Sequence, residues 1–211
     1  MFTDRTDAGT QLAKQLLKFK NQDVIVLAIP RGGLPLGAIV AKTLNAPLDV
    51  ALSKKIGHPY NKEYAIGAVG IDTLILTDAM GVTKGYIEEE TAAIREKLKE
   101  RYRDYYKNRS PQNLKDKEVI LVDDGIATGN TILITAEIAH RQGAKKIIIA
   151  VPVAPTSTVE KLKNSAYIDE VVCLDTPYDF KAVGQFYSKF PQVSDREAIA
   201  LLEGTSDKWL K

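Results

Sequence analysis

The sequence predicts an α/β fold: an open, mostly parallel sheet with helices on both faces. Five short apolar runs rich in β-branched residues alternate with segments of helical periodicity. Continuous apolar runs are typical of strands covered on both faces, and their alternation with helices favours right-handed crossovers between parallel strands. The predicted strands are residues 24–29, 48–52, 119–122, 147–151 and 171–174.

Segments with helical periodicity lie before, between and after these strands, as the crossover connections of a parallel sheet require. The pattern at 131–142 stops at Gly143, and glycine readily adopts the left-handed conformation found just after many helices. A chain of 211 residues can bury a sizeable core in one domain, so residues 1–211 are interpreted as a single domain. The other predicted helices are 7–18, 36–44, 156–163 and 195–203.

Residues 53–110 interrupt this alternation and are interpreted as an insertion, because one crossover needs far fewer residues. The stretch "EYAIGAVGIDTLILTD" is typical of a β-hairpin that turns near 70–72. Residues 85–107 predict a long helix with one apolar stripe. We expect 57–61 to act as a lid and 175–211 to form a C-terminal hood.

Composition and charge exclude several classes of protein. With 45% hydrophobic residues and a net charge of +2, the chain is neither disordered nor strongly basic, so no nucleic-acid partner is expected. No run approaches the ~18 apolar residues of a membrane span, and the N-terminus lacks a signal-peptide pattern, which predicts a cytoplasmic protein without membrane contact. Cys173 is the only cysteine and is interpreted as a small buried apolar residue.

The stretch "VILVDDGIATGNT" (119–131) runs a strand into two carboxylates and a loop of small residues. The backbone N–H groups of such a loop and the positive end of the helix that follows it can both bind an anion, so this stretch predicts an anion site. A phosphate monoester fits better than a triphosphate, because Asn130 stands where a nucleotide-binding loop of the Walker type needs lysine. The predicted phosphate ligands are Gly125, Ala127, Thr128, Gly129, Asn130 and Thr131.

Asp123 and Asp124 can face one ligand only where the strand ends and the chain turns. There they could accept hydrogen bonds from the vicinal hydroxyls of a ribose whose 5′-phosphate lies in the loop. An isolated pair of aspartates is more often a solvated turn or a helix cap. The adjoining apolar strand and small-residue loop favour the ligand-binding interpretation.

Two further strand ends carry positive charge. "PRGG" (30–33) offers Arg31 as a bidentate anion ligand, while Gly32 and Gly33 allow close approach of the backbone. Lys54 and Lys55 follow the second predicted strand. Tight packing alone would explain the glycines, and solvation alone would explain the lysines, so neither motif is specific by itself.

Together these motifs resemble those of the type I phosphoribosyltransferases, whose signature for 5-phosphoribosyl 1-pyrophosphate (PRPP) has the form "VILVDDGIATGNT". The resemblance implies that Asp123 and Asp124 bind the ribose hydroxyls, that 127–131 bind the 5′-phosphate, and that "PRGG" binds pyrophosphate together with Lys54 and Lys55. In relatives the peptide bond after the residue matching Arg31 is often cis.

More narrowly, "DRTDAGTQLAKQL", "AIPRGGLPLGAIVA", "EYAIGAVG" and "FKAVGQFYSKFPQVSDREA" are similar to a subgroup of phosphoribosyltransferases with no assigned acceptor. The implied reaction is transfer of the 5-phosphoribosyl group from PRPP to a nucleobase-like small molecule, with release of pyrophosphate. Asp123, Asp124 and Arg31 are the predicted catalytic residues. The alternative is a non-catalytic regulator that senses nucleotides on the same scaffold.

The remaining expectations concern the cofactor, the acceptor and the assembly. Mg²⁺ is expected, bound mainly by oxygens of the ligand and not directly by a protein metal site. A homo-oligomer is expected. His58 and His140 are interpreted as loop or surface residues, although His58 could also contact pyrophosphate. The predicted acceptor pocket contains Val153, Ala154, Asp175, Tyr178 and Phe180, of which the two aromatic rings could stack on a planar base or pack in the core.

Overall fold

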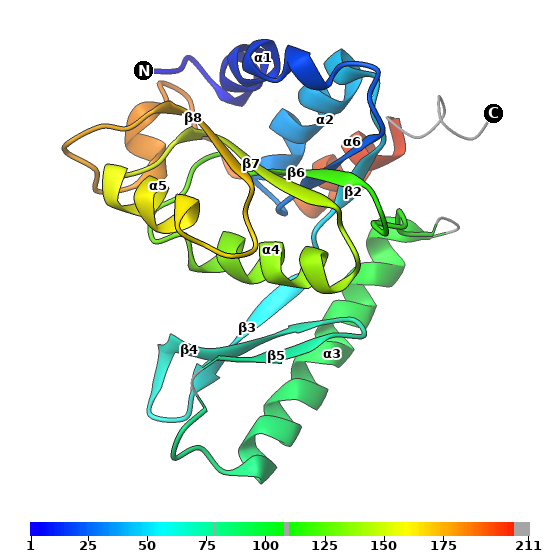
Figure 1. Cartoon of the computed structure of the whole chain (residues 1–211), viewed down its shortest axis with the longest axis vertical. Helices are drawn as coiled ribbons and strands as arrows, with labels where there is room; N and C mark the ends of the chain where they lie inside the picture. The colour runs from blue at the N-terminus through cyan, green and yellow to red at the C-terminus, as the bar shows by residue number, and fades with distance from the viewer. Residues whose placement is uncertain (78, 108–109, 205–211) are drawn as a thin grey trace. The chain divides into compact units, whose positions relative to one another are not determined.

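The computed structural model describes residues 1–77, 79–107 and 110–204. The chain divides into two compact units, Leu52–Ser110 and the residues before and after it. Figure 1 labels the elements of both units. The interpretation of 53–110 as an insertion into a single domain stays a prediction.

The first unit is built on a five-stranded sheet in the order β2-β1-β6-β7-β8, in which all neighbouring strands are parallel. Every residue of β1 is buried, as expected for a strand with helices on both faces. This arrangement confirms the predicted α/β fold class. The strands are β1 (Val24–Ala28), β2 (Leu48–Val50), β6 (Glu118–Val122), β7 (Lys146–Val153) and β8 (Glu170–Asp175).

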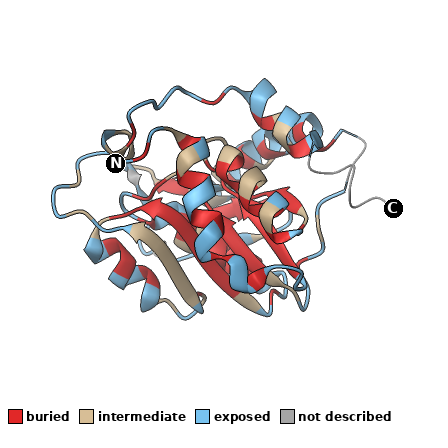
Figure 2. Ribbon diagram, turned by 90° about the horizontal axis from the view of Figure 1, so that it is seen from above, coloured by how far each residue is buried: buried red, intermediate tan, exposed pale blue. Residues whose placement is uncertain are grey.

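Helices cover the two faces of this sheet in pairs. On one face, α1 (Arg5–Gln15) and α2 (Gly33–Leu44) pack together and against the strands. On the other face, α4 (Asn130–Arg141) packs on β6 and β7, while α5 (Thr156–Lys163) packs on β8 (Figure 1). Figure 2 shows the resulting buried layer of strands between partly exposed helices. The last described helix, α6 (Asp195–Gly204), packs against α2 and β2.

The predicted hood, residues 175–211, contacts the N-terminus through backbone hydrogen bonds. Phe2 donates its N–H to the carbonyl of Phe186 at 2.8 Å, and Ser188 donates to the carbonyl of Phe2 at 2.8 Å. The rings of Phe2 and Tyr187 lie 5.5 Å apart. The short 3-10 helices η1 (Leu17–Phe19) and η2 (Val183–Phe186) complete this unit. Of the predicted hood, residues 205–211 lie outside the described residues.

The second unit is a three-stranded antiparallel sheet with one long helix. Its strands are β3 (Ser53–His58), β4 (Asn61–Gly70) and β5 (Leu74–Leu76), and its helix is α3 (Lys84–Tyr106). The hairpin of β4 and β5 with its turn after Gly70 is confirmed, although Asp78 at its end lies outside the described residues. The long helix is confirmed too, and Thr91, Ile94, Leu98 and Tyr105, which share one of its faces, are buried.

Strand β3 was not predicted from the sequence. The residues 57–61 expected to form a lid are the end of this strand and the turn into β4. β3 is an edge strand, and within it only Ile56 and Gly57 are buried. Its sequence therefore lacks the apolar run by which the other strands were predicted. Movement of this turn stays a prediction.

No helix in the described ranges combines the length and the apolar character needed to cross a membrane.

Candidate functional site

The candidate site lies where the strand order reverses. Strand β2, which follows β1 in the sequence, lies on one side of β1. The later strands β6, β7 and β8 lie on the other side. Loops at the carboxyl ends of two such neighbouring strands diverge and leave a crevice that ligands commonly occupy. Here the two loops are 29–32 after β1 and 123–129 after β6.

These loops touch each other closely. Ile29 donates its N–H to the carbonyl of Val122 at 2.9 Å, which continues the strand pairing to the edge of the crevice. A Cβ atom added to Gly32 would lie only 2.1 Å from Oδ2 of Asp124. Only glycine therefore fits at residue 32 while the Asp124 carboxylate keeps its position.

A cavity of about 390 Å³ opens between the loops. It brings together five of the predicted ligand residues: Arg31, Gly32, Asp123, Asp124 and Thr131. The other side chains that line it, apart from Pro30 of the "PRGG" motif, were not identified from the sequence; they come from the N-terminus, from the end of β1 and from the hood. They are Arg5, Ile29, Pro30, Gln192 and Val193.

The two carboxylates repel each other in a partly buried position. Burial raises the pKa of Asp123 well above its usual value, and the charge of Asp124 raises it further. Burial also raises the pKa of Asp124, although the guanidinium of Arg5 opposes that shift. Asp123 Oδ1 accepts the backbone N–H of Asp124 at 2.8 Å. The crevice therefore holds negative charge that the protein neutralises only in part.

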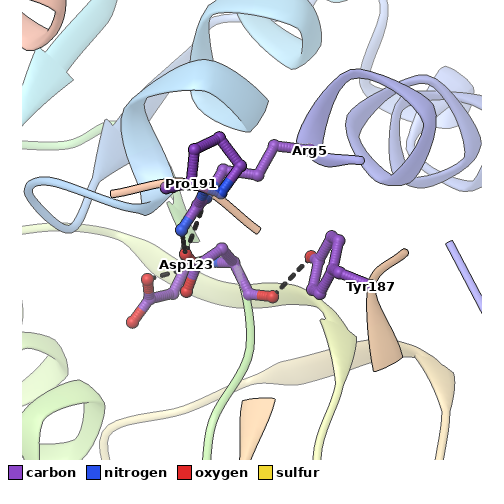
Figure 3. Close-up of polar contacts among 5 residues, drawn as sticks. Arg5, Asp123, Tyr187 and Pro191 are labelled. Atoms are coloured by element: carbon purple, nitrogen blue, oxygen red, sulfur yellow. Dashed lines mark hydrogen bonds and ion pairs between the residues drawn. The ribbon is translucent and has the colours of Figure 1, made fainter. Parts of the chain in front are cut away.

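Arg5 provides the compensating charge. Its Nε and Nη2 lie 2.9 and 2.8 Å from Oδ2 of Asp124, and its Nη1 donates to the carbonyl of Pro191 at 2.6 Å (Figure 3). The guanidinium also stacks 3.9 Å from the ring centre of Phe190. Tyr187 donates its hydroxyl to the carbonyl of Asp124 at 2.6 Å. Helix α1, the β6 loop and the hood thus meet around the pair formed by Arg5 and Asp124.

No local sequence signal points to Arg5. It is the first residue of α1, where the partial positive charge of a helix N-terminus disfavours a cation. A buried arginine at that position needs a specific anionic partner. Its partner lies 119 residues further along the chain, so no local pattern identifies it.

The predicted phosphate loop leads directly into α4. Gly129 occupies the N-cap with φ of 74°, a conformation that favours glycine, and no side chain caps the helix. Ala127, Thr128, Asn130 and Thr131 are exposed, whereas Gly125 is buried. The first N–H groups of α4 are therefore presented without a side-chain cap, as an anion site requires.

The remaining predicted pyrophosphate ligands are placed as follows. Gly33 begins α2, and Arg31 lies at the cavity with Nη1 3.5 Å from Oδ2 of Asp195. The cis peptide bond joins Pro30 to Arg31, one bond earlier than expected. Lys54 and Lys55 lie on β3 in the second unit, and their role stays a prediction.

The predicted acceptor residues do not line this cavity. Val153 and Ala154 are fully buried, and Tyr178 is fully exposed. Asp175 is the register partner of Val153, and Phe180 stacks on Phe186 with ring centres 5.2 Å apart. Their assignment to an acceptor pocket stays a prediction.

A larger cavity of about 570 Å³ adjoins the first, with Arg5, Gln192 and Val193 in the walls of both. Its apolar walls come from the start of α2, from the hood and from α6. They include Pro35, Pro191, Ala200 and Leu201. A volume of this order is ordinary for a small-molecule site.

The cysteine and the histidines have surroundings that explain them structurally. Cys173 is only partly buried, less than the sequence predicted, but this burial raises the pKa of its thiol to about 11, so it is a poor nucleophile at neutral pH. The Cys173 thiol donates to the carbonyl of Asp175 at 3.2 Å. His140 packs on Tyr167, and His58 packs on Tyr60 and Tyr64. Within the described ranges, no three His, Cys, Asp or Glu side chains are grouped to bind a metal ion.

Comparisons with known proteins identify similar sequences and structures. Residues 3–187 match the family model described as "Phosphoribosyl transferase domain". The chain is 41% identical over 210 residues to a Mycobacterium tuberculosis protein whose name assigns it provisionally to the phosphoribosyl transferases. That match covers 96% of this chain and 46% of the relative, so the chain spans about half the length of the curated relatives it matches.

Two solved structures show how far the fold is shared. The TT1426 protein from Thermus thermophilus is 39% identical, with a TM-score of 0.87 over 95% of this chain and 97% of that one. The AQ2163 protein from Aquifex aeolicus is 13% identical, with a TM-score of 0.50 over 82% of this chain and 74% of that one, which is a likeness of fold alone.

Replacing Arg5 by Met should lower the free energy of unfolding at pH 7 by about 3–5 kcal/mol, because it leaves the buried Asp124 carboxylate unpaired. The loss should be smaller at pH 5, where that carboxylate protonates more readily. Adding Asp124→Asn should recover part of the loss. Urea unfolding of the single and double variants measures these differences. A loss below about 1 kcal/mol for Arg5→Met would contradict the assigned pairing.

Replacing Asp123 by Asn should stabilise the ligand-free protein at pH 7. The pKa of Asp123 is raised in the folded state, so its contribution to stability is full below the unfolded-state pKa and is lost as pH rises through the folded-state pKa. The variant should therefore gain most over the parent at pH 7 and little near pH 4. Asp116→Asn, at an exposed residue before β6, is the control and should show no such gain. A destabilised Asp123→Asn at pH 7 would contradict the repulsion.

Proposed function

We propose a transfer reaction for this chain, which belongs to the phosphoribosyl transferase family. In this reaction the 5-phosphoribosyl group of PRPP is transferred to a nucleobase-like acceptor, and pyrophosphate is released. The observation that carries the proposal is the meeting of "PRGG" and "DDGIATGNT" around one cavity at the switch point of the sheet. A carboxylate pair, an arginine and an uncapped helix N-terminus there match the diol, pyrophosphate and phosphate of PRPP.

Each part of PRPP has a counterpart in this arrangement. The hydroxyls on C2 and C3 of the ribose donate to the carboxylates of Asp123 and Asp124. The 5′-phosphate accepts N–H groups from the loop 127–131 and the start of α4. Arg31 binds the pyrophosphate oxygens from the opposite loop. The anions thus lie at the two ends of the cavity, with the sugar between them.

The charges are arranged for cleavage of the bond between C1 and the pyrophosphate oxygen. As that bond breaks, its electron pair leaves with pyrophosphate and positive charge develops on the ribose ring. Carboxylates beside the ring favour that charge, and Arg31 favours the leaving group. A ring nitrogen of the acceptor then forms the new bond to C1, and its proton is lost to solvent. Since the carboxylates are fixed before ligand arrives, little reorganisation is needed.

Mg²⁺ fits these residues as a ligand-borne cofactor. Mg²⁺ commonly keeps several waters and binds phosphate oxygens, so it would be held mainly by PRPP, beside the carboxylates of Asp123 and Asp124 at the cavity. When bound, it would neutralise negative charge on PRPP and its leaving group. Nearby positive charge would also lower the raised pKa of Asp123 toward the ionised form.

The acceptor is proposed to bind in the 570 Å³ cavity. This cavity shares Arg5, Gln192 and Val193 with the PRPP cavity, so a ligand there would face the ribose across a common wall. Its apolar walls suit a planar ring, and its polar rim could fix the ring's orientation. In the acceptor pocket predicted from the sequence, which is the alternative pocket, the side chains of Val153 and Ala154 are buried and therefore less accessible to a ligand.

The combined variant Asp123→Asn with Asp124→Asn should lose Mg²⁺-dependent binding of PRPP by about 100-fold or more, since about 1.5–3 kcal/mol is expected for each charge-assisted hydrogen bond. Calorimetric titration with PRPP and Mg²⁺ measures this loss. Asp116→Asn is the matched control and should bind as the parent does. Unchanged binding by the double variant would remove the carboxylates from the site.

Pyrophosphate release tests the transfer reaction itself. The parent protein with PRPP and Mg²⁺ is expected to release pyrophosphate when a suitable base from a panel of purines, pyrimidines and related heterocycles is added. Release that no acceptor stimulates, despite tight PRPP binding, would contradict transfer and indicate a regulator that senses the ligand.

Ala200→Trp should fill part of the 570 Å³ cavity from the exposed face of α6. For whichever base supports pyrophosphate release, the KM should rise about 10-fold or more, while PRPP binding stays within about twofold. Tyr178→Ala, in the alternative pocket, should leave both values unchanged. An altered KM only in Tyr178→Ala would place the acceptor in the pocket predicted from the sequence.

A further inference from the structure

Helix α5 contacts the phosphate loop through two side chains. Thr158 donates its hydroxyl to the carbonyl of Ala127 at 2.6 Å. Lys161 Nζ lies 3.3 Å from the carbonyl oxygen of Thr128 and 2.7 Å from Oδ1 of Asn130. Figure 1 shows α5 beside α4, the helix that the phosphate loop leads into. No role in the site was predicted for α5 from the sequence.

These contacts fix the direction of the loop's N–H groups. In a trans peptide the C=O and N–H bonds point in opposite directions. The carbonyl of Ala127 shares a peptide with the N–H of Thr128, and the carbonyl of Thr128 shares one with the N–H of Gly129. Because α5 binds both carbonyls, both N–H groups point away from α5. In the part of the chain that the structure describes, no hydrogen bond uses either N–H.

Lys161 also brings charge to a loop that has none of its own. Residues 125–131 contain no charged side chain. The contacts of Lys161 are to neutral oxygens, and among the described residues no carboxylate pairs with it. Its ammonium group therefore lies at the phosphate loop with its charge uncompensated. A phosphate dianion is the ligand that such a charge would favour.

We propose that α5 is part of the 5′-phosphate site, with Thr158 and Lys161 as positioning residues that hold the loop carbonyls, and with the charge of Lys161 favouring the phosphate from the opposite face of the loop. On binding, Lys161 keeps its contacts with the carbonyl of Thr128 and with Oδ1 of Asn130, and its charge attracts the phosphate without touching it. Thr158 keeps the loop carbonyl turned away, so that the N–H groups face the ligand. Lys161 thereby selects phosphorylated sugars over unphosphorylated ones. This inference rests on the proposed function, because it assigns the same loop to the 5′-phosphate of PRPP.

The test compares Lys161→Met with Lys163→Met, which removes an equivalent charge two residues away at an exposed position. Titration with ribose 5-phosphate should give about 10-fold weaker binding or more for Lys161→Met, and binding within about twofold of the parent for Lys163→Met. Lys161→Arg should keep most of the affinity. Thr158→Val should weaken binding several-fold. In steady state, Lys161→Met should raise the KM for PRPP with little change in kcat.

The pH dependence separates a lysine whose charge attracts the phosphate from a lysine that only holds the loop in place. The second ionisation of a phosphate monoester lies near pH 6, so the parent should bind ribose 5-phosphate more tightly at pH 7.5 than at pH 5. Lys161→Met should show a smaller difference, because the cation that favours the dianion is missing.

Two outcomes distinguish the inference from the function it rests on. Equal affinities and equal pH dependence in Lys161→Met and Lys163→Met, with normal PRPP binding by the parent, would overturn the role of α5 alone. Failure of the parent to bind PRPP with Mg²⁺ would instead overturn the proposed function.

Discussion

The ion pair between Arg5 and Asp124 is the contact on which the candidate site depends. It joins α1 to the loop after β6, and the same guanidinium binds the carbonyl of Pro191 in the hood. The side chains of Arg5 and Asp124 are only 10% and 14% exposed, so neither charge has much water to replace its partner. Three segments far apart in the sequence are therefore positioned by one charged contact.

This contact also explains how the fold tolerates two adjacent carboxylates in a confined place. Burial and mutual repulsion disfavour ionised Asp123, and a protein selected for stability alone would not place it there. The unfavourable charge becomes useful if the ligand brings hydroxyl donors and a bound cation. The two carboxylates then destabilise the ligand-free protein, but they strengthen ligand binding and stabilise positive charge on the sugar.

The sequence predicted the parts of the molecule that local patterns encode. The parallel sheet, its helices and the loop 123–131 follow from apolar runs and from the small residues after β6. Arg5, Tyr187 and Lys161 reach the site only through tertiary packing, and no spacing along the chain links them to Asp124 or Thr128. β3 escaped detection because an edge strand needs few apolar residues.

A crystal structure of the chain soaked with Mg²⁺ and PRPP tests the central claim most directly. We expect the 5′-phosphate against the N–H groups of 127–131, the ribose hydroxyls on Asp123 and Asp124, and pyrophosphate beside Arg31. An empty loop after β6, with PRPP bound elsewhere on the protein, would contradict it.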